Sequence, residues 1–307
     1  MQMPKMLGTA NTFKQVSIIG GGLMGSGIAQ VVAQKGQMVN LVEVNDSILK
    51  ISRAKIEQDI EKLSKKLYKD SKESSSYFDQ VLGRINYFAD IPKAVESSNI
   101  VVEAVVENFD IKKNIFLSVE EAAPEEAILC TNTSSLSISR IGSVLKKQDR
   151  FGGVHFFNPV PLMNLVEVIR SDKTSDKTYE MLFAWTKSIG RVPVACKDVP
   201  GFIVNKLLAV FIAEAIKMYE KGDASKEAID TAIKLGANHP MGPIELSDLI
   251  GHDTVAMIFK NLREGEPENK MFEPLKSQIR LLEEGKLGVK SGEGYYKYPR
   301  KSTTSLS

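Results

Sequence analysis

The sequence predicts an α/β protein, with a doubly wound, mostly parallel sheet followed by an all-α C-terminal domain. Over the first two thirds of the chain, short apolar runs alternate with helical patterns, which is typical of a parallel sheet covered by helices. After the turn at 198–201, helical patterns alone follow. We therefore expect two domains, at 14–200 and 201–300, with flexible tails at 1–13 and 301–307.

Composition and charge exclude several classes of protein. The formal net charge of +2 gives no reason to expect nucleic acid as a partner, and no apolar run is long enough to insert into a membrane. The two cysteines, Cys130 and Cys196, stand in apolar runs, so we expect free buried thiols in a reducing compartment. Residues 1–13 make a poor transit peptide. No metal-ligand spacing is found, so no metal is expected.

A glycine-rich turn joins the first predicted strand, 15–20, to the first helix, 23–35. Gly20 permits the tight turn, Gly22 lets the backbone approach a pyrophosphate, and Gly25 lets the helix pack closely on the strand. The unpaired N–H groups at the helix start then receive the phosphate charge. This is the Rossmann-type dinucleotide fingerprint. The predicted cofactor contacts in the turn are Gly20, Gly22, Leu23, Met24 and Gly25.

An acidic residue follows the second predicted strand. The apolar run 38–42 leads into Glu43, at roughly the 20-residue spacing at which the fingerprint places its ribose-binding acid. A carboxylate there would repel the 2′-phosphate of NADP. Strand, turn, helix and acid together predict NAD as the cofactor, and they argue against a simple surface turn.

Residues 46–68 read as a long charged helix, and 70–77 as the polar loop of a helical hairpin inserted near 46–80. The helix has two interpretations. It is a solvated face with ion pairs such as Glu61 with Lys65, or a docking face for a phosphate-bearing substrate. Composition alone favours the solvated face. A short strand is predicted next, at 85–88.

Polar side chains follow the next two predicted strands, 99–106 and 127–130. Ligands of open α/β sheets bind outside the carboxyl ends of the strands, so Glu107 and Lys112 are candidate cofactor contacts. Glu107 is equally consistent with a charge that stabilises a helix N-terminus. The five small polar residues at 131–135 form a helix cap, a wall of the site, or both.

His155 stands in a predicted strand at 151–157, and Glu167 in the next, at 165–169. A short turn could bring both onto neighbouring strands. A carboxylate beside an imidazole fixes its tautomer and supports its charge, which suits general acid–base catalysis. The alternative is a histidine that merely fills the core, and the residues alone leave this open.

The last strand of the sheet is predicted at 192–196. Asn205 stands early in the first helix of the C-terminal domain, where it could point into the cleft between domains. His239 and His252 read as structural or surface residues, and the glycines and lysines of 287–296 could close over a ligand. The predicted helices span 202–221, 225–236, 243–261 and 271–285.

Several separate stretches now resemble the L-3-hydroxyacyl-CoA dehydrogenases of the short-chain, mitochondrial type. The most telling are HFFNPVP at 155–161 and PGFIVN at 200–205. The others are 20–29, 101–108, 131–136, 166–168, 222–225, 241–243 and 290–294.

The resemblance implies NAD-dependent oxidation of the 3-hydroxyl of a fatty acyl-CoA to a 3-oxo group, as in β-oxidation. His155 would be the general base and Glu167 would orient it. Ser134, Asn158 and Asn205 would hold the reacting oxygen and the thioester carbonyl by hydrogen bonds. The cofactor contacts it implies, beyond the glycine turn, are Glu43, Glu107, Lys112, Ser134, Asn158 and Lys290.

The resemblance also assigns the acyl-CoA substrate to the charged helix, together with Ser134. Lys66 matches a lysine that contacts CoA, whereas Asp59 stands where the family has a serine. Glu43 likewise replaces a more usual aspartate but keeps the charge. The implied assembly is a homodimer through the C-terminal helical domain. The implied compartment is the mitochondrial matrix, with the cytoplasm as the alternative.

Two other functions fit the same architecture. An L-gulonate-type sugar-acid 3-dehydrogenase would keep the glycine turn, His155 and Glu167 but need no CoA groove. A crystallin-like structural protein would bind NAD without turnover, and loss of His155 or Glu167 would have favoured it. Lys66 and the basic helix favour the CoA substrate.

Overall fold

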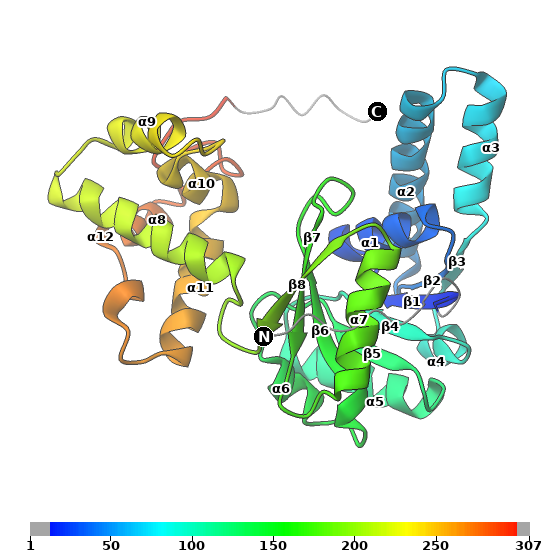
Figure 1. The fold of residues 1–307 in the computed structure, drawn as a ribbon. Coiled ribbons are helices and arrows are strands. Elements are labelled where there is room, and N and C mark those ends of the chain that lie inside the picture. Colours follow the sequence, from blue (N-terminus) through cyan, green and yellow to red (C-terminus); the bar gives the residue numbers. More distant parts are fainter. Residues whose placement is uncertain (1–12, 300–307) are drawn as a thin grey trace. The chain divides into compact units, whose positions relative to one another are not determined.

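The computed structural model describes residues 13–299 (Figure 1). The chain divides between Asp198 and Val199 into two compact units. The tails predicted to be flexible fall almost wholly outside the described residues. The exception is Phe13, which is buried in the core of the first unit with 6% of its surface exposed.

The first unit is built on an eight-stranded sheet in the order β3-β2-β1-β4-β5-β6-β7-β8. All neighbouring strands are parallel except β6 and β7, which confirms the predicted doubly wound, mostly parallel fold. The strand predicted at 99–106 is shorter, because β4 ends at Glu103. The strands are β1 Gln15–Ile19, β2 Met38–Val42, β3 Ile85–Phe88, β4 Ile100–Glu103, β5 Ile128–Thr131, β6 Phe151–Phe156, β7 Leu165–Arg170 and β8 Val192–Lys197.

Helices cover both faces of the sheet (Figure 1). In β1, Val16 and Ile18 pack into the core that α1 and α7 share, because alternate residues of a strand face opposite sides. Ser17, between them, faces the other side, where its hydroxyl donates to the carbonyl of Ala94 at 2.6 Å. The helices of this unit, besides a hairpin, are α1 Leu23–Gln34, α4 Ile91–Val95, α5 Phe109–Ala122, α6 Ile138–Gly142, the 3₁₀ turn η1 Gln148–Arg150 and α7 Asp176–Ser188.

The hairpin consists of α2, Asp46–Leu67, and α3, Ser71–Leu82. The prediction of a polar loop over 70–77 was wrong, because the side chain of Asp70 caps α3 by accepting hydrogen bonds from two backbone N–H groups. The serines after it are helical. Ser74 is buried, and its hydroxyl donates to that of Ser64 on α2 at 3.0 Å. The predicted ion pair of Lys65 with Glu61 is present, at 2.6 Å on an exposed face.

The second unit is helical. One helix predicted over 243–261 is two, because Gly251 between them has a φ of +96° that ends the first helix. The segment predicted at 271–285 is also split, with its helix starting only at Lys276. The elements are α8 Val204–Lys221, α9 Lys226–Gly236, α10 Pro243–Ile250, α11 His252–Gly265, the 3₁₀ turn η2 Lys270–Phe272 and α12 Lys276–Glu283.

A buried carboxylate organises this unit. Asp248 accepts hydrogen bonds from Nε2 of His252 at 2.7 Å and from the backbone N–H groups of Tyr295 and Tyr296 at 2.9 and 2.8 Å. The glycine-containing tail therefore packs on α10. His252 is fully buried and structural, as predicted. His239 is exposed.

Both cysteines are free and buried, as predicted, and burial raises the pKa of the Cys196 thiol to about 11. Between residues 13 and 299, no helix has both the length and the apolar character needed to cross a membrane.

Candidate active site

The glycine turn between β1 and α1 is built by close backbone approach. Gly20 has a φ of +106°, and a Cβ there would lie 2.7 Å from the carbonyl oxygen of Ala104. A Cβ on Gly25 would lie 1.8 Å from the carbonyl oxygen of Gly20. By contrast, a Cβ on Gly22 would meet no atom within 4 Å, and no side chain caps the helix there. The turn thus leaves open space over the N–H groups that begin α1, where an anion binds favourably.

A cavity of about 520 Å³ adjoins this turn. Glu43 lies in its wall together with Gly20 and Gly22. The carboxylate of Glu43 accepts a hydrogen bond from the N–H of Gly21 at 3.0 Å, so it is held against the turn. The remaining wall is mainly apolar, including Val42, Val44, Ile48, Ile91, Val106 and Ile115. An apolar slot with one carboxylate beside a phosphate-binding turn fits the adenosine half of NAD and disfavours a 2′-phosphate.

Lys112 lies beneath the neighbouring strand ends. Its side chain is 1% exposed, and its Nζ lies 2.7 Å from Oε1 of Glu103 and 3.2 Å from Oε2 of Glu107. Glu103 is fully buried and also accepts from the hydroxyl of Thr131 at 2.7 Å. Lys112 is therefore a buried cation shared by two carboxylates, one at the end of β4 and one before α5.

Glu107 holds the loop that follows β5. Its Oε1 accepts from the N–H groups of Ser134 and Ser135, both at 3.0 Å, and from the Thr133 hydroxyl at 2.5 Å. Burial alone would raise the pKa of Glu107, but the charge of Lys112 and the hydroxyl donors hold that pKa below its usual value. Lys112 thus anchors Glu107, and Glu107 in turn positions Ser134, which is exposed. These contacts bring three predicted site residues together.

His155 and Glu167 are directly opposite one another on β6 and β7. Their side chains lie on the same face, and Nδ1 of His155 is 2.7 Å from Oε2 of Glu167. His155 is 5% exposed and Glu167 is fully buried. A buried carboxylate on Nδ1 orients the imidazole and leaves Nε2 as the ring nitrogen for proton transfer, which is the geometry that a general acid–base pair requires.

A second cavity, of about 460 Å³, is lined by α1, by α2 and by residues 158–162 after β6. We call it the α1–α2 groove. Asn158 lines it, together with Asp59 and Lys66 of α2, so the structure brings these predicted residues to one cavity. Gly27 of α1 allows the loop after β6 to approach, since a Cβ there would lie 2.9 Å from Val160.

The negative charge of Asp59, which lines the groove, is paired with a lysine. Its Oδ2 lies 3.2 Å from Nζ of Lys55, one helical turn earlier. Lys62 and Lys66 also line the groove, and within residues 13–299 neither has a carboxylate partner. The balance of charge along this wall is therefore positive, which suits an anionic ligand.

Asn205 and Lys290 belong to the second unit. Asn205 lies in the first turn of α8 and is half-buried, and Lys290 pairs with Asp253 at the start of α11. Their predicted roles at the site remain predictions.

Glu103 and Asn132 are supporting residues that the sequence analysis did not single out. Asn132 accepts a hydrogen bond from the N–H of Phe156 at 2.9 Å and so joins the ends of β5 and β6. The sequence does contain a signal for Glu103, which is an acid at the end of an apolar run. An acid in such a position is buried, and a buried carboxylate requires charged or hydrogen-bonding partners.

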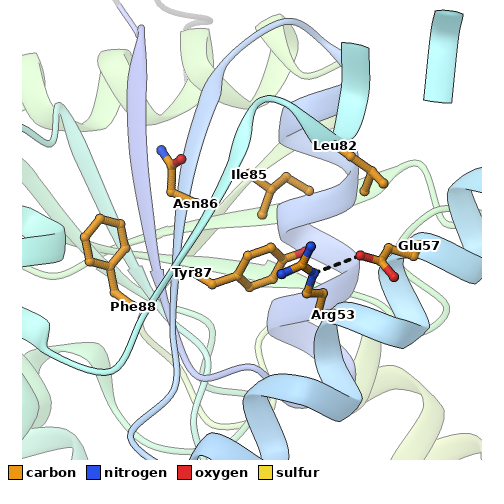
Figure 2. A pocket seen from close by; sticks show the side chains of 7 residues that line it. All are labelled: Arg53, Glu57, Leu82, Ile85, Asn86, Tyr87 and Phe88. Carbon is orange, nitrogen blue, oxygen red and sulfur yellow. Dashed lines mark hydrogen bonds and ion pairs between the residues drawn. The ribbon is translucent and has the colours of Figure 1, made fainter. Parts of the chain in front are cut away.

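A third cavity, of about 500 Å³, lies between α2 and β3 (Figure 2). Arg53 lies over the ring of Tyr87, 5.4 Å from its centre, and pairs with Glu57 at 2.8 Å. Burial raises the pKa of Tyr87 to about 12. No predicted site residue lines this cavity, so it is not part of the candidate active site.

The turn with Glu43 accommodates a dinucleotide without a 2′-phosphate, and the His155–Glu167 pair on the same sheet can exchange a proton. The first unit therefore has the parts of an NAD-dependent dehydrogenase. The model of the 3-hydroxyacyl-CoA dehydrogenase NAD-binding domain matches residues 15–199, and that of the C-terminal domain matches 201–298. The chain belongs to the 3-hydroxyacyl-CoA dehydrogenase family, and its cofactor is NAD.

Individual relatives agree. The chain is 48% identical to the human mitochondrial hydroxyacyl-coenzyme A dehydrogenase over 286 residues, which cover 93% of this chain and 91% of that protein. It is 40% identical to the 3-hydroxybutyryl-CoA dehydrogenase of Clostridioides difficile over 92% of this chain and 99% of that one. The crystal structure of (S)-3-hydroxybutyryl-CoA dehydrogenase from Ralstonia eutropha superimposes with a TM-score of 0.88 and 36% identity, covering 94% of this chain and 100% of that chain.

Proposed function

We propose that this enzyme oxidises the 3-hydroxyl of an L-3-hydroxyacyl-CoA to a 3-oxo group in fatty acid β-oxidation. The observation that carries the proposal is the buried pair of His155 with Glu167, at 2.7 Å, on the same sheet as the glycine turn. Relatives named for hydroxyacyl-CoA substrates support the substrate class.

In this mechanism His155 takes the proton of the substrate hydroxyl through Nε2, and Glu167 stabilises the imidazolium that forms. NAD, when bound, accepts the hydride from C3. Ser134, Asn158 and Asn205 donate hydrogen bonds to the reacting oxygen and to the thioester carbonyl. In the reverse direction the His155 imidazolium returns the proton to the forming hydroxyl. The cofactor would be held by the glycine turn with Leu23 and Met24, by Glu43, and by Glu107, Ser134, Asn158 and Lys290. Buried Lys112 would act on it through Glu107, which it anchors.

The α1–α2 groove binds the CoA part of the substrate. Lys66 and Lys62 line it without carboxylate partners among residues 13–299, so they are available for phosphate groups. The ion pair of Asp59 with Lys55 reduces the repulsion that an acid would otherwise exert on the ligand.

The test is the initial rate of NADH oxidation with 3-oxoacyl-CoA thioesters of increasing chain length, beginning with acetoacetyl-CoA. We expect rapid turnover of thioesters and none of free 3-oxo acids. Turnover of a sugar acid instead would favour the L-gulonate-type dehydrogenase. NADH binding without turnover of any substrate would favour the crystallin-like protein.

We also propose a homodimer formed through the C-terminal helical unit, in the mitochondrial matrix. Leu207 on α8 is 65% exposed, Leu235 on α9 is 82% exposed and Leu249 on α10 is 53% exposed, so this unit offers large apolar side chains that a partner would bury. Four similar relatives are named mitochondrial. Light scattering measures the molecular mass in solution, and we expect the mass of a dimer for the wild type and of a monomer for Leu207→Glu. Cell fractionation tests the compartment.

A further inference from the structure

The α1–α2 groove has a second wall that carries no charge. α1 contributes Gln30 and Gln34, which are one helical turn apart and therefore share a face. The opposite wall, from α2, carries the lysines. The groove is thus polar and neutral along one side and cationic along the other.

The amides of these two glutamines have no protein partner. Gln30 is 4% exposed, and its side chain makes no hydrogen bond to any residue between 13 and 299. In Gln34, Nε2 is enclosed and also lacks a partner in that range. Polar side chains that are buried are nearly always hydrogen-bonded, so the buried Gln30 and the enclosed Nε2 of half-buried Gln34, both lining one cavity, indicate a ligand that supplies the partners. Ser26 on the same face is different, since its hydroxyl donates to the carbonyl of Gly21 at 2.6 Å.

The length and the lining of the groove indicate what kind of ligand it can bind. The stretch of α1 from Leu23 to Gln34 spans about 16 Å at the usual helical rise. Apolar side chains, including Ile56, Leu63 and Val160, complete the lining. A groove with neutral amides on one wall, lysines on the other and apolar side chains between them matches a flexible chain that contains amide groups and carries phosphates.

We propose that Gln30 and Gln34 form the subsite that recognises the amide groups of the pantetheine arm of the substrate. This rests on the proposed function. Each glutamine donates to a carbonyl or accepts from an N–H of the arm. Lys62 and Lys66 bind the phosphates, and Asn158 contacts the thioester. The two glutamines therefore determine that the enzyme prefers pantetheine thioesters to simple alkyl thioesters.

The test uses three substrates with the same acyl group: acetoacetyl-CoA, acetoacetyl-pantetheine without phosphates, and the S-ethyl thioester without amides. Gln30→Leu and Gln34→Leu should each raise KM about tenfold for the first two substrates, the effect of one lost hydrogen bond. The KM for the S-ethyl thioester and every kcat should stay unchanged, because the lost contact acts equally on substrate and transition state. Lys66→Gln should raise KM for the CoA thioester alone.

Gln80→Leu is the matched control, since Gln80 is an exposed glutamine of α3 whose amide donates to Ser76. Unchanged NADH affinity in each variant shows that the glycine turn is intact. Wild-type KM for acetoacetyl-pantetheine in both glutamine variants overturns the subsite and leaves the proposed function standing. An equal rise of KM for the S-ethyl thioester also overturns the subsite. No turnover of any thioester by the wild-type enzyme overturns the proposed function and the subsite with it.

Discussion

Nδ1 of His155 lies 2.7 Å from Oε2 of Glu167, across the antiparallel pairing of β6 with β7. Twelve positions separate the two residues in the chain, but the register of the strands places them directly opposite one another. Because side chains at paired positions point to the same face, this register alone decides that the carboxylate reaches the imidazole. A slip of one residue would turn them to opposite faces.

His155→Gln should lower kcat by about 10²- to 10⁴-fold, the usual contribution of a general base, and leave NADH affinity nearly unchanged. Steady-state rates and NADH fluorescence titration measure the two effects. His239→Gln, at an exposed histidine of the second unit, is the control and should behave as wild type. Loss of turnover and of NADH binding by the same factor would contradict the assigned role.

Lys112→Met should lower the free energy of unfolding by about 3–5 kcal/mol, because it leaves the fully buried Glu103 without its cation. Urea denaturation followed by circular dichroism measures this. Lys65→Met is the control: it removes an exposed ion pair with Glu61, which solvent screens, and should change stability far less. Equal effects of the two substitutions would show that the buried pair contributes no more than a surface pair.

The lowered pKa of Glu107 makes a prediction about pH. The carboxyl has a lower pKa in the folded than in the unfolded chain, so its stabilising effect is complete above the unfolded value of about 4.3. That effect is lost as the pH falls through the folded value. Wild type should therefore be more stable than Glu107→Gln near neutral pH, and the difference should shrink in acid. Urea denaturation of both proteins across this range measures it; a difference that stays constant would be evidence against the assignment.

Asp248→Asn should destabilise the second unit by about 1–3 kcal/mol. The new amide group points an N–H toward donors that now face the carboxylate, namely His252, Tyr295 and Tyr296. Thermal unfolding and proteolysis of the tail measure the change. Asp253→Asn is the control, because the Asp253 side chain is about half exposed, and besides its ion pair with Lys290 it accepts only a local hydrogen bond from the N–H of Thr254 among the described residues. If Asp253→Asn is destabilised as much as Asp248→Asn, Asp248 is not the residue that organises this unit.

Much of this protein follows from the sequence by itself. The eight strands and the glycine turn were predicted, because local periodicity and turn chemistry act over a few residues. The errors were also local. The serines at 74–76 resemble a loop but are helical after the Asp70 cap, and Gly251 divides what reads as one helix.

Only the tertiary structure decided which distant side chains meet. The burial of Lys112 between two carboxylates, and the unpartnered amides of Gln30 and Gln34 in the α1–α2 groove, have no signature in any short stretch of sequence. They depend on strand order, strand register and the packing of the helical hairpin. These are set by long-range contacts among many residues, and a pattern read along the chain does not contain them.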